Sequence, residues 1–248
     1  MEKELERIKQ ATGSTEVEMI NLPEELEKMV ALRPESRPSV NQLFQIRGYT
    51  VSHCLDVANC MISVAKFRKL DQRQTARLVL GGLLHDVGKK GIDQEIIEST
   101  KKLSPAEREA MDRHARLSFD LLVRDMPDVA ALVVAHHEFQ EKIPHKNRHG
   151  TERRHLGQDE ICPIVDDRRS ERRNGDAESE KWGQVLALID QFHAEIDSKR
   201  DYRKADSIDK VIKEKRAVTY FSASTKELLE VIADHYRRSG LYDASTTM

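Results

Sequence analysis

Residues 81–90 read GGLLHDVGKK and place a histidine and an aspartate directly after an apolar run. The leucines predict that the helix ending here is buried, so His85 and Asp86 would lie close to the protein interior. Moving a carboxylate from water into an apolar interior without a partner costs several kcal/mol. The pair therefore requires water, a hydrogen-bond network or a metal ion.

The composition limits the classes of protein to which the chain can belong. It has 248 residues, of which 38% are hydrophobic and 34% charged, with a formal net charge of −2. This balance argues against a partner that is a nucleic-acid polymer, since proteins that bind one usually carry a basic excess. No segment approaches the roughly 20 continuous apolar residues of a membrane span. The N-terminal MEKELERIKQ also lacks the apolar core of a signal peptide, so we expect no membrane association.

The cysteines indicate the compartment. The three of them cannot all pair with one another, and no two form a CxxC motif. Reduced, unpaired thiols are typical of cytoplasmic proteins. We therefore expect a cytoplasmic protein.

Apolar periodicity indicates helices along most of the chain, and we find no strand alternation. The predicted fold is all-α, a helical bundle with a long polar loop insertion. Asp71 with Gln74, and Ser104 with Glu107, form helix-capping signatures that predict two helix starts. The other expected helices cover about residues 40–67 and begin near 127, 182 and 224.

We expect three parts: an N-terminal helical arm over 1–40, a main domain over 41–238 and a flexible tail over 239–248. Within the main domain, residues 139–181 have almost no apolar periodicity and contain charged runs such as DDRRSERRNGDAESE. Loops of this length are usually functional or mobile. We interpret this segment as a polar insertion that could bind a regulatory protein partner.

Residues with metal-ligating side chains recur along the expected helices, each beside apolar neighbours. Asp190 is the clearest case, because it interrupts an otherwise apolar helix face. Helix bundles build dinuclear metal sites from such residues on facing helices, and the set is too large for one zinc ion, which takes about four ligands. The set is His53, His85, Asp86, His114, His136, His137 and Asp190.

The alternative is that these histidines are ordinary core residues. A single histidine beside leucines is more often a hydrogen-bonded core residue or a helix cap than a ligand. Adjacent helical residues point about 100° apart, so His136 and His137 can simply divide between core and surface. The metal hypothesis thus depends on the joint order of the set. We interpret the remaining histidines as ordinary ones: His145, His149, His155, His193 and His235.

The ordered set resembles the HD-GYP family, a branch of the HD-domain phosphohydrolases. The order is His53, HDVGK at 85–89, His114, HHE at 136–138 and Asp190. The resemblance extends from about residue 45 to 235. It includes LSPAEREAMDRH (103–114), similar to the segment before the family's third ligand, and LALIDQFHAEIDSKRDYRKA (186–205), similar to its D-x-(F/Y)-x-A segment.

The resemblance implies an HD-type helical domain around two divalent metal ions bridged by Asp86. Iron or manganese comes first, with nickel or zinc as alternatives. Two cations roughly 3.5–4 Å apart can activate a shared water for attack on phosphorus. The further ligands of the first ion would be His53, His85 and Asp190, and those of the second ion His114, His136 and His137.

The resemblance also implies roles for basic residues. Lys89 would contact a phosphate oxygen as a point charge and act with Asp86 as the catalytic pair. Arg200 and Arg203 match the family's phosphate-contacting basic pair. The implied activity is that of a phosphodiesterase, with a cyclic dinucleotide, cyclic di-GMP first, hydrolysed to the linear dinucleotide or to GMP.

The chain departs from the family after the HHE segment. The family continues there with D-G-x-G-Y-P, whereas this chain reads FQEKIPHKNRHG (139–150). Ser118 replaces a family glycine, and Tyr49 stands where three-metal members carry a carboxylate, so we expect two metals. Two other functions stay open: a degenerate domain that binds a nucleotide or protein partner in signalling without hydrolysis, and an HD phosphohydrolase acting on another phosphate ester.

Overall fold

The computed structural model describes residues 22–136, 177–198 and 205–239. Every regular element in these ranges is a helix, which confirms the predicted all-α fold. In chain order the elements are α2 (Glu24–Leu32), η1 (Pro34–Ser36), α3 (Arg37–Leu43), α4 (Tyr49–Phe67), α5 (Gln72–Leu84), η2 (Val87–Gly91), α6 (Gln94–Ile97), α7 (Pro105–Asp112), α8 (His114–Leu122), α9 (Pro127–Ala135), α11 (Ala177–Ile196), α12 (Ile208–Ala217), α13 (Ala223–Lys226) and α14 (Leu229–Ser239).

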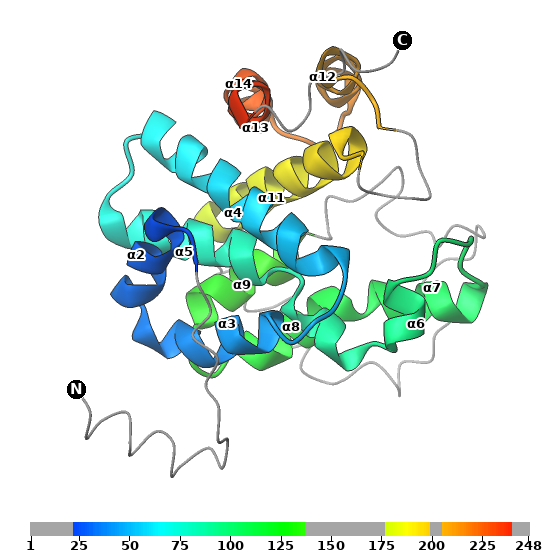
Figure 1. Ribbon diagram of the computed structural model, residues 1–248. Helices are drawn as coiled ribbons and strands as arrows, with labels where there is room; N and C mark the ends of the chain where they lie inside the picture. Colours follow the sequence, from blue (N-terminus) through cyan, green and yellow to red (C-terminus); the bar gives the residue numbers. More distant parts are fainter. Residues whose placement is uncertain (1–21, 137–176, 199–204, 240–248) are drawn as a thin grey trace.

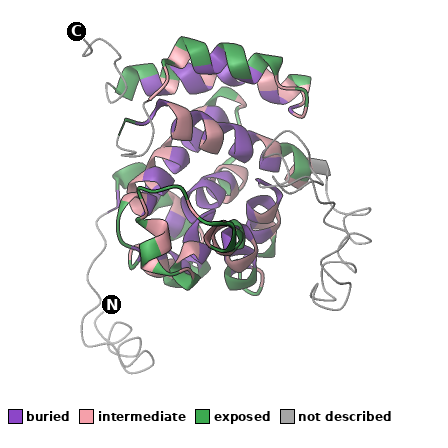
Figure 2. Ribbon diagram, turned by 90° about the vertical axis from the view of Figure 1, so that its right-hand side faces the viewer, coloured by how far each residue is buried: buried purple, intermediate pink, exposed green. Residues whose placement is uncertain are grey.

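Helices α4 and α5 pack along each other at the centre of the domain (Figure 1). Helix α9 packs against α5, and α11 packs against both α9 and α4. Helix α8 contacts α9 and the short helix η2 that follows α5. Helix α14 packs against α4, with α12 beside it at the top of Figure 1. Figure 2 shows that the buried residues lie on the sides of the helices that face one another.

The core is one apolar cluster that includes the first described helix. Leu26 and Val30 of α2 belong to the same cluster as Leu83 of α5 and Leu186 of α11. The described part of the predicted N-terminal arm therefore packs against α5 and contributes to the domain core. The domain boundary near residue 40 stays a prediction.

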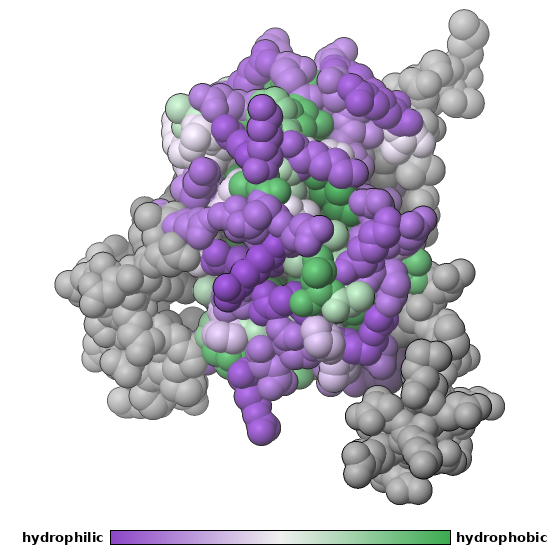
Figure 3. All heavy atoms as spheres, turned by 90° about the vertical axis from the view of Figure 1, so that its left-hand side faces the viewer, coloured by the Kyte–Doolittle hydropathy of each residue, from purple (hydrophilic) through white to green (hydrophobic). Residues whose placement is uncertain are grey.

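The surface is mainly polar where it is described. Figure 3 shows hydrophilic side chains over most of one face, with small apolar areas between them. Large hydrophobic side chains with substantial exposure are Leu32, Phe67 and Leu121. No helix in the described ranges is both long enough and apolar enough to cross a membrane.

The predicted capping boxes are both confirmed. The Asp71 carboxylate accepts a hydrogen bond from the backbone N–H of Gln74 at 2.8 Å, and the Gln74 side chain accepts from the backbone of Asp71, so α5 begins here. Ser104 and Glu107 make the same reciprocal pair at the start of α7. These local hydrogen bonds satisfy backbone donors that a helix N-terminus leaves without partners.

The expected continuous helix over 40–67 is wrong. The chain forms α3, turns, and starts α4 at Tyr49. Gly48 lies in the turn with φ of 75°, in the left-handed region that favours glycine. The periodicity of the apolar residues continues across the turn, which is why the sequence pattern hides it.

Two further helix boundaries differ from expectation near the C-terminal half. Helix α11 begins at Ala177 rather than at Trp182, so residues 177–181 of the predicted insertion are helical. Glu178 and Glu180 lie in its first turn, where negative charge stabilises a helix. Near residue 224, where a helix start is expected, α13 begins at Ala223 and is capped by Ser222, whose hydroxyl accepts from the backbone N–H of Thr225 at 3.2 Å.

Replacing Leu122 by alanine tests the packing of α8. Its side chain is fully buried, whereas the neighbouring Leu121 is 40% exposed. Leu122→Ala is expected to lower the free energy of unfolding by about 2–5 kcal/mol because it leaves a cavity. Leu121→Ala is the matched control and is expected to change it by less than about 1 kcal/mol. Urea denaturation measures both, and equal losses would contradict this orientation of α8.

Candidate metal centre

The HD pair lies at the end of α5, inside the protein. Leu84 is the last residue of α5, His85 caps the helix, and Asp86 precedes η2. His85 is only 1% exposed and Asp86 only 2%. The apolar run that precedes the pair is buried as predicted, and it carries both side chains into the interior.

Four other segments bring side chains to the same place. His53 comes from α4, His114 begins α8, His136 follows α9, and Asp190 lies in α11. Nε2 of His114 is 3.1 Å from Oδ1 of Asp86. Nε2 of His53 is 3.0 Å from Oδ1 of Asp190, which is also 3.9 Å from Nε2 of His85. The structure thus brings together every described member of the predicted ligand set.

Asp86 belongs to two groups of potential ligands. Its carboxylate forms one group with His53 and His85, and a second group with His114 and His136. Within each group the ligand atoms lie within 4.8 Å of one another. This sharing matches the arrangement implied by the resemblance, in which one carboxylate bridges two ions. Of the other predicted site residues, His137, Arg200 and Arg203 lie outside the described residues.

Three histidines are oriented by the ends of helices. Nδ1 of His85 is 2.8 Å from the carbonyl oxygen of Gly82, and Nδ1 of His114 is 2.6 Å from that of Met111. Nδ1 of His136 makes the same contact with the carbonyl of Val133. Because a carbonyl can only accept, Nδ1 must carry the proton in each ring. Nε2 then presents its lone pair to the carboxylates.

This donor set fits a divalent cation. Nε2 of His85 is buried and forms no hydrogen bond among the described residues. Lone pairs of imidazole nitrogens and ionised carboxylate oxygens facing one another require a positive charge between them. Histidine ligands whose second nitrogen donates to a backbone carbonyl are the usual pattern in metal sites. The residues present therefore suit a metal ion, held by imidazole Nε2 and carboxylate oxygen atoms.

The electrostatics of the cluster favour the protonation states that bind metal. Burial lowers the pKa of His53 to about 3, and it lowers the pKa of His136 to about 3 as well. Burial alone would raise the pKa of Asp86, but the positive charge of Lys89 holds it well below its usual range. The cluster thus combines neutral imidazoles with an ionised carboxylate at neutral pH, which is the ligand form of both.

Comparison with known proteins identifies the family. The chain matches the HD domain family over residues 50–195, which includes every described residue of the cluster. The protein belongs to the HD-domain family. The all-α architecture of this HD domain agrees with that assignment.

Two curated relatives indicate which members of the HD-domain family the chain resembles. A cyclic di-GMP phosphodiesterase of Pseudomonas aeruginosa is 31% identical over 122 residues, which is 48% of this chain and 29% of the relative. A 3′3′-cGAMP-specific phosphodiesterase of Vibrio cholerae is 26% identical over 196 residues, which is 76% of this chain and 37% of the relative. The chain therefore spans about a third of the length of these relatives. These matches confirm the recognition of an HD-GYP-like member of the HD-domain family.

The side chain of Lys89 contacts the carboxylate of Asp86, which the two groups of potential ligands share. Its Nζ is 2.6 Å from Oδ2 of Asp86. Burial would lower the pKa of Lys89, but the charge and hydrogen bond of Asp86 raise it above its usual value. The side chain is therefore an ammonium ion held at the edge of the cluster. Its predicted contact with phosphate stays a prediction.

Ser118 is a residue whose role the sequence did not reveal. Its hydroxyl donates to the carbonyl of His85 at 2.7 Å and accepts from the backbone N–H of Gly88 at 2.8 Å. Ser118 therefore joins the backbone before and after Asp86 to α8 by hydrogen bonds. Its place four residues after His114 on the same helix face is the sequence signal that could have indicated this contact.

His193 was interpreted as an ordinary buried histidine, and it is indeed buried and hydrogen-bonded. The structure adds that its partner is a predicted ligand, because the Nδ1 atoms of His193 and His53 are 2.8 Å apart. Its spacing three residues after Asp190 was the available signal. His235, by contrast, bonds to Ser63 at 2.8 Å away from the cluster.

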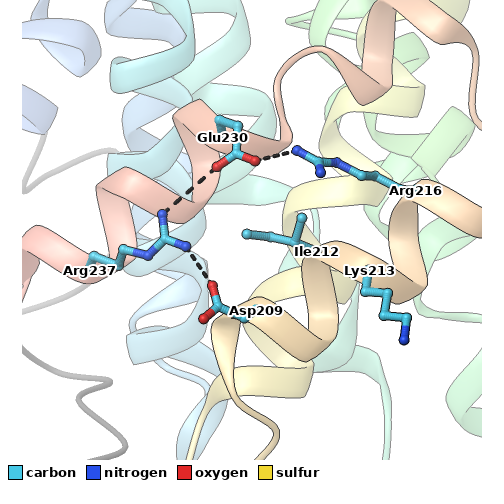
Figure 4. A pocket seen from close by; sticks show the side chains of 6 residues that line it. All are labelled: Asp209, Ile212, Lys213, Arg216, Glu230 and Arg237. Carbon is cyan, nitrogen blue, oxygen red and sulfur yellow. Dashed lines mark hydrogen bonds and ion pairs between the residues drawn. The ribbon is translucent and has the colours of Figure 1, made fainter.

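Figure 4 shows a groove between α12 and α14. Its walls carry ion pairs, with Arg216 bonded to Glu230 and Arg237 to Asp209 at 2.7 Å. None of the predicted ligands lines it. We assign this groove no part in the chemistry.

Gly88→Ala tests the close approach between the HD turn and α8. A Cβ atom at Gly88 would lie 2.3 Å from the carbonyl oxygen of His114 and 2.3 Å from the backbone nitrogen of Ser118. Backbone atoms cannot yield cheaply, so we expect a loss of about 1–3 kcal/mol or more in unfolding free energy, together with reduced metal content. Thermal unfolding and elemental analysis measure the two effects.

The matched control is Gly91→Ala in the same short helix. A Cβ there would meet only the end of the flexible Leu117 side chain, at 3.3 Å. We expect stability within about 0.5 kcal/mol of wild type, as for most surface substitutions. Equal behaviour of the two variants would contradict the described contact.

Acid is expected to destabilise the metal-free HD domain. His53 and His136 have folded-state pKa values of about 3, below their ordinary 6.5. As the pH falls through 6.5, the unfolded chain takes up protons that the folded chain does not, so stability falls. Asp86 acts in the same direction at lower pH, because its depressed pKa contributes stability that is lost once it is protonated. Urea unfolding in chelator at several pH values measures the decline.

His136→Asn is the control for this pH dependence. It removes one of the two buried neutral imidazoles while keeping a polar side chain. The unfolding free energy should then vary less steeply with pH below about 6, by up to about 1.4 kcal/mol per pH unit, the value for one proton. An unchanged slope would contradict a neutral, buried His136.

Proposed function

We propose that this HD domain is a metal-dependent phosphodiesterase that hydrolyses a cyclic dinucleotide, with cyclic di-GMP as the first candidate. The observation that carries the proposal is the buried Asp86 carboxylate shared by two groups of histidines. The two relatives, both named as phosphodiesterases of cyclic dinucleotides, support it.

The proposed ligands divide between two ions. His53, His85 and Asp190 would lie on one side of Asp86, and His114 and His136 on the other, with His137 as the remaining predicted ligand. Two divalent ions bound there would supply Lewis acidity to the phosphate and a water of lowered pKa as nucleophile. Iron or manganese is our first choice, with nickel or zinc as alternatives, because imidazole and carboxylate ligands suit all of them.

The protein's own residues would position the phosphate. The ammonium group of Lys89 is held 2.6 Å from Asp86, so a phosphate that approaches the shared carboxylate would meet a positive charge there. Arg200 and Arg203 are proposed to contact the phosphate as well. The segment after His136 is proposed to select the substrate, because this is where the chain departs from the family's D-G-x-G-Y-P motif.

Two alternative functions are supported by a feature of the sequence. The chain lacks the family's D-G-x-G-Y-P motif after the HHE segment. This favours either a degenerate domain that binds a nucleotide or a protein partner without hydrolysis, or a phosphohydrolase acting on another phosphate ester. A regulatory partner would bind through the 139–181 insertion.

The proposed compartment is the cytoplasm. Cys54 and Cys60 are free thiols and both are buried. Buried free thiols are typical of proteins in a reducing compartment.

Incubating the metal-loaded chain with a panel of phosphate esters tests the proposal. The panel contains cyclic di-GMP, 3′3′-cGAMP, linear dinucleotides and phosphomonoesters, and chromatography follows the products. Turnover of a cyclic dinucleotide is expected. Turnover confined to other esters supports a phosphohydrolase that acts on another phosphate ester. Tight binding of cyclic di-GMP without turnover supports the degenerate domain.

Asp86→Ala is expected to release both metals and to abolish turnover. The rate should fall by at least about a hundredfold, since even outer-shell partners of metal ligands cost 10–100-fold. Asp120→Ala is the matched control, because Asp120 is exposed and pairs with Arg116 on the surface of α8. Elemental analysis accompanies the assay, and two metals retained in Asp86→Ala would refute the assignment.

A further inference from the structure

His53 differs from the other histidines of the cluster in what holds its Nδ1 atom. His85, His114 and His136 each follow the last residues of a helix, and each bonds to a carbonyl three residues earlier. The last four carbonyls of a helix have no partner in the helix, so they are free to accept these bonds. His53 lies inside the 19-residue helix α4, where the helix uses its own carbonyls.

A second imidazole takes the place of the missing carbonyl. Nδ1 of His193, on α11, lies 2.8 Å from Nδ1 of His53, and both rings are buried. One of these two atoms must donate and the other accept. If Nε2 of His53 presents its lone pair to a metal, its proton is on Nδ1, and Nδ1 of His193 is the acceptor.

The surroundings of His193 favour this assignment. Its Nε2 is 3.3 Å from Oδ2 of Asp56 and 3.8 Å from Oδ2 of Asp197. Two carboxylates beside Nε2 hold a proton there, which leaves the Nδ1 lone pair available to His53. The hydroxyl of Tyr49 lies 3.4 Å from Nδ1 of His193 and can also donate a hydrogen bond to that lone pair. This hydrogen bond does not protonate the ring, so Nδ1 of His193 stays an acceptor.

The contacts close a ring between two helices. On α4, His53 and Asp56 are three residues apart, and on α11, Asp190 and His193 have the same spacing, so each pair lies on one helix face. Nε2 of His53 faces Asp190, its Nδ1 faces His193, and His193 in turn faces Asp56. Helix α11 thus supplies both a predicted ligand and the support for the ligand opposite.

We propose that His193 is a positioning residue that fixes the tautomer and ring orientation of His53, with Asp56 holding the proton on the far side of His193. This inference rests on the proposed metal centre. It concerns the half of the centre formed by His53, His85 and Asp190. The other half depends on backbone carbonyls and is independent of His193.

Two amides at position 193 separate positioning from simple packing. Asparagine places its amide oxygen where Nδ1 of histidine lies, and so keeps an acceptor for His53. Glutamine places its amide near the Nε2 position and leaves Nδ1 of His53 without its acceptor. His193→Phe is a third variant, which retains the ring volume beside Tyr236 but has no acceptor.

Titration calorimetry of the full chain with manganese(II) measures the two affinities. His193→Gln and His193→Phe are expected to bind one of the two ions about 10–100-fold more weakly, the usual cost of losing a second partner of a ligand histidine. The other ion should bind as in wild type, and His193→Asn should stay within about threefold of wild type for both. Equal affinities in the asparagine and glutamine variants would overturn the inference, even if the phenylalanine variant does not fold.

The nitrogen NMR spectrum of the histidine rings gives a readout that packing alone would not change. In the wild-type chain with zinc bound, His193 should carry its proton on Nε2 and His53 on Nδ1. A proton on Nδ1 of His193 would overturn the inference. If the wild-type chain binds no metal, the proposed function fails and the inference fails with it, whereas zinc binding with the proton on Nδ1 of His193 overturns the inference alone.

Discussion

The buried carboxylate of Asp86 is the constraint on which the centre of this HD domain depends. A carboxylate that is 2% exposed must be balanced by nearby positive charge or hydrogen-bond donors. Lys89 supplies part of that balance, and the proposed metal ions would supply the rest. The side chains around it come from α4, α5, α8, α9 and α11, so balancing this one charge also specifies how those helices meet.

Helix ends are the second feature that the site requires. His85 and His136 each follow a helix, and His114 stands at the break between α7 and α8. At each position a carbonyl left over by the preceding helix orients the imidazole. The break at residue 113, between α7 and α8, therefore has a function. It frees the carbonyl of Met111 to accept from His114.

The same reasoning explains why two polar residues outside the predicted set matter. His53 lies inside a helix and receives its support from His193 instead of a carbonyl. Ser118 ties the HD turn to α8 by accepting from Gly88 and donating to His85. Both residues contact predicted ligands without belonging to the predicted set, and both contacts join segments far apart in the sequence.

Much of this architecture could be predicted from the sequence. Apolar periodicity indicated an all-α fold, and the capping residues Asp71 and Ser104 located two helix starts, because these signals act within a few residues. The ordered set of histidines and aspartates indicated the cluster through its resemblance to a known family. Short-range patterns could not show the turn at Gly48, because apolar spacing continues across it.

The sequence by itself thus determined which residues are chemically able to form the centre, since residue type and local order decide that. Only the tertiary structure decided how they are arranged. It showed that Asp86 is shared between two groups, that Nε2 rather than Nδ1 faces the carboxylates, and that Nδ1 of His193 lies 2.8 Å from Nδ1 of His53. Distances of about 3 Å between helices far apart in the chain carry these facts, and they arise from packing, which no local pattern of residues encodes.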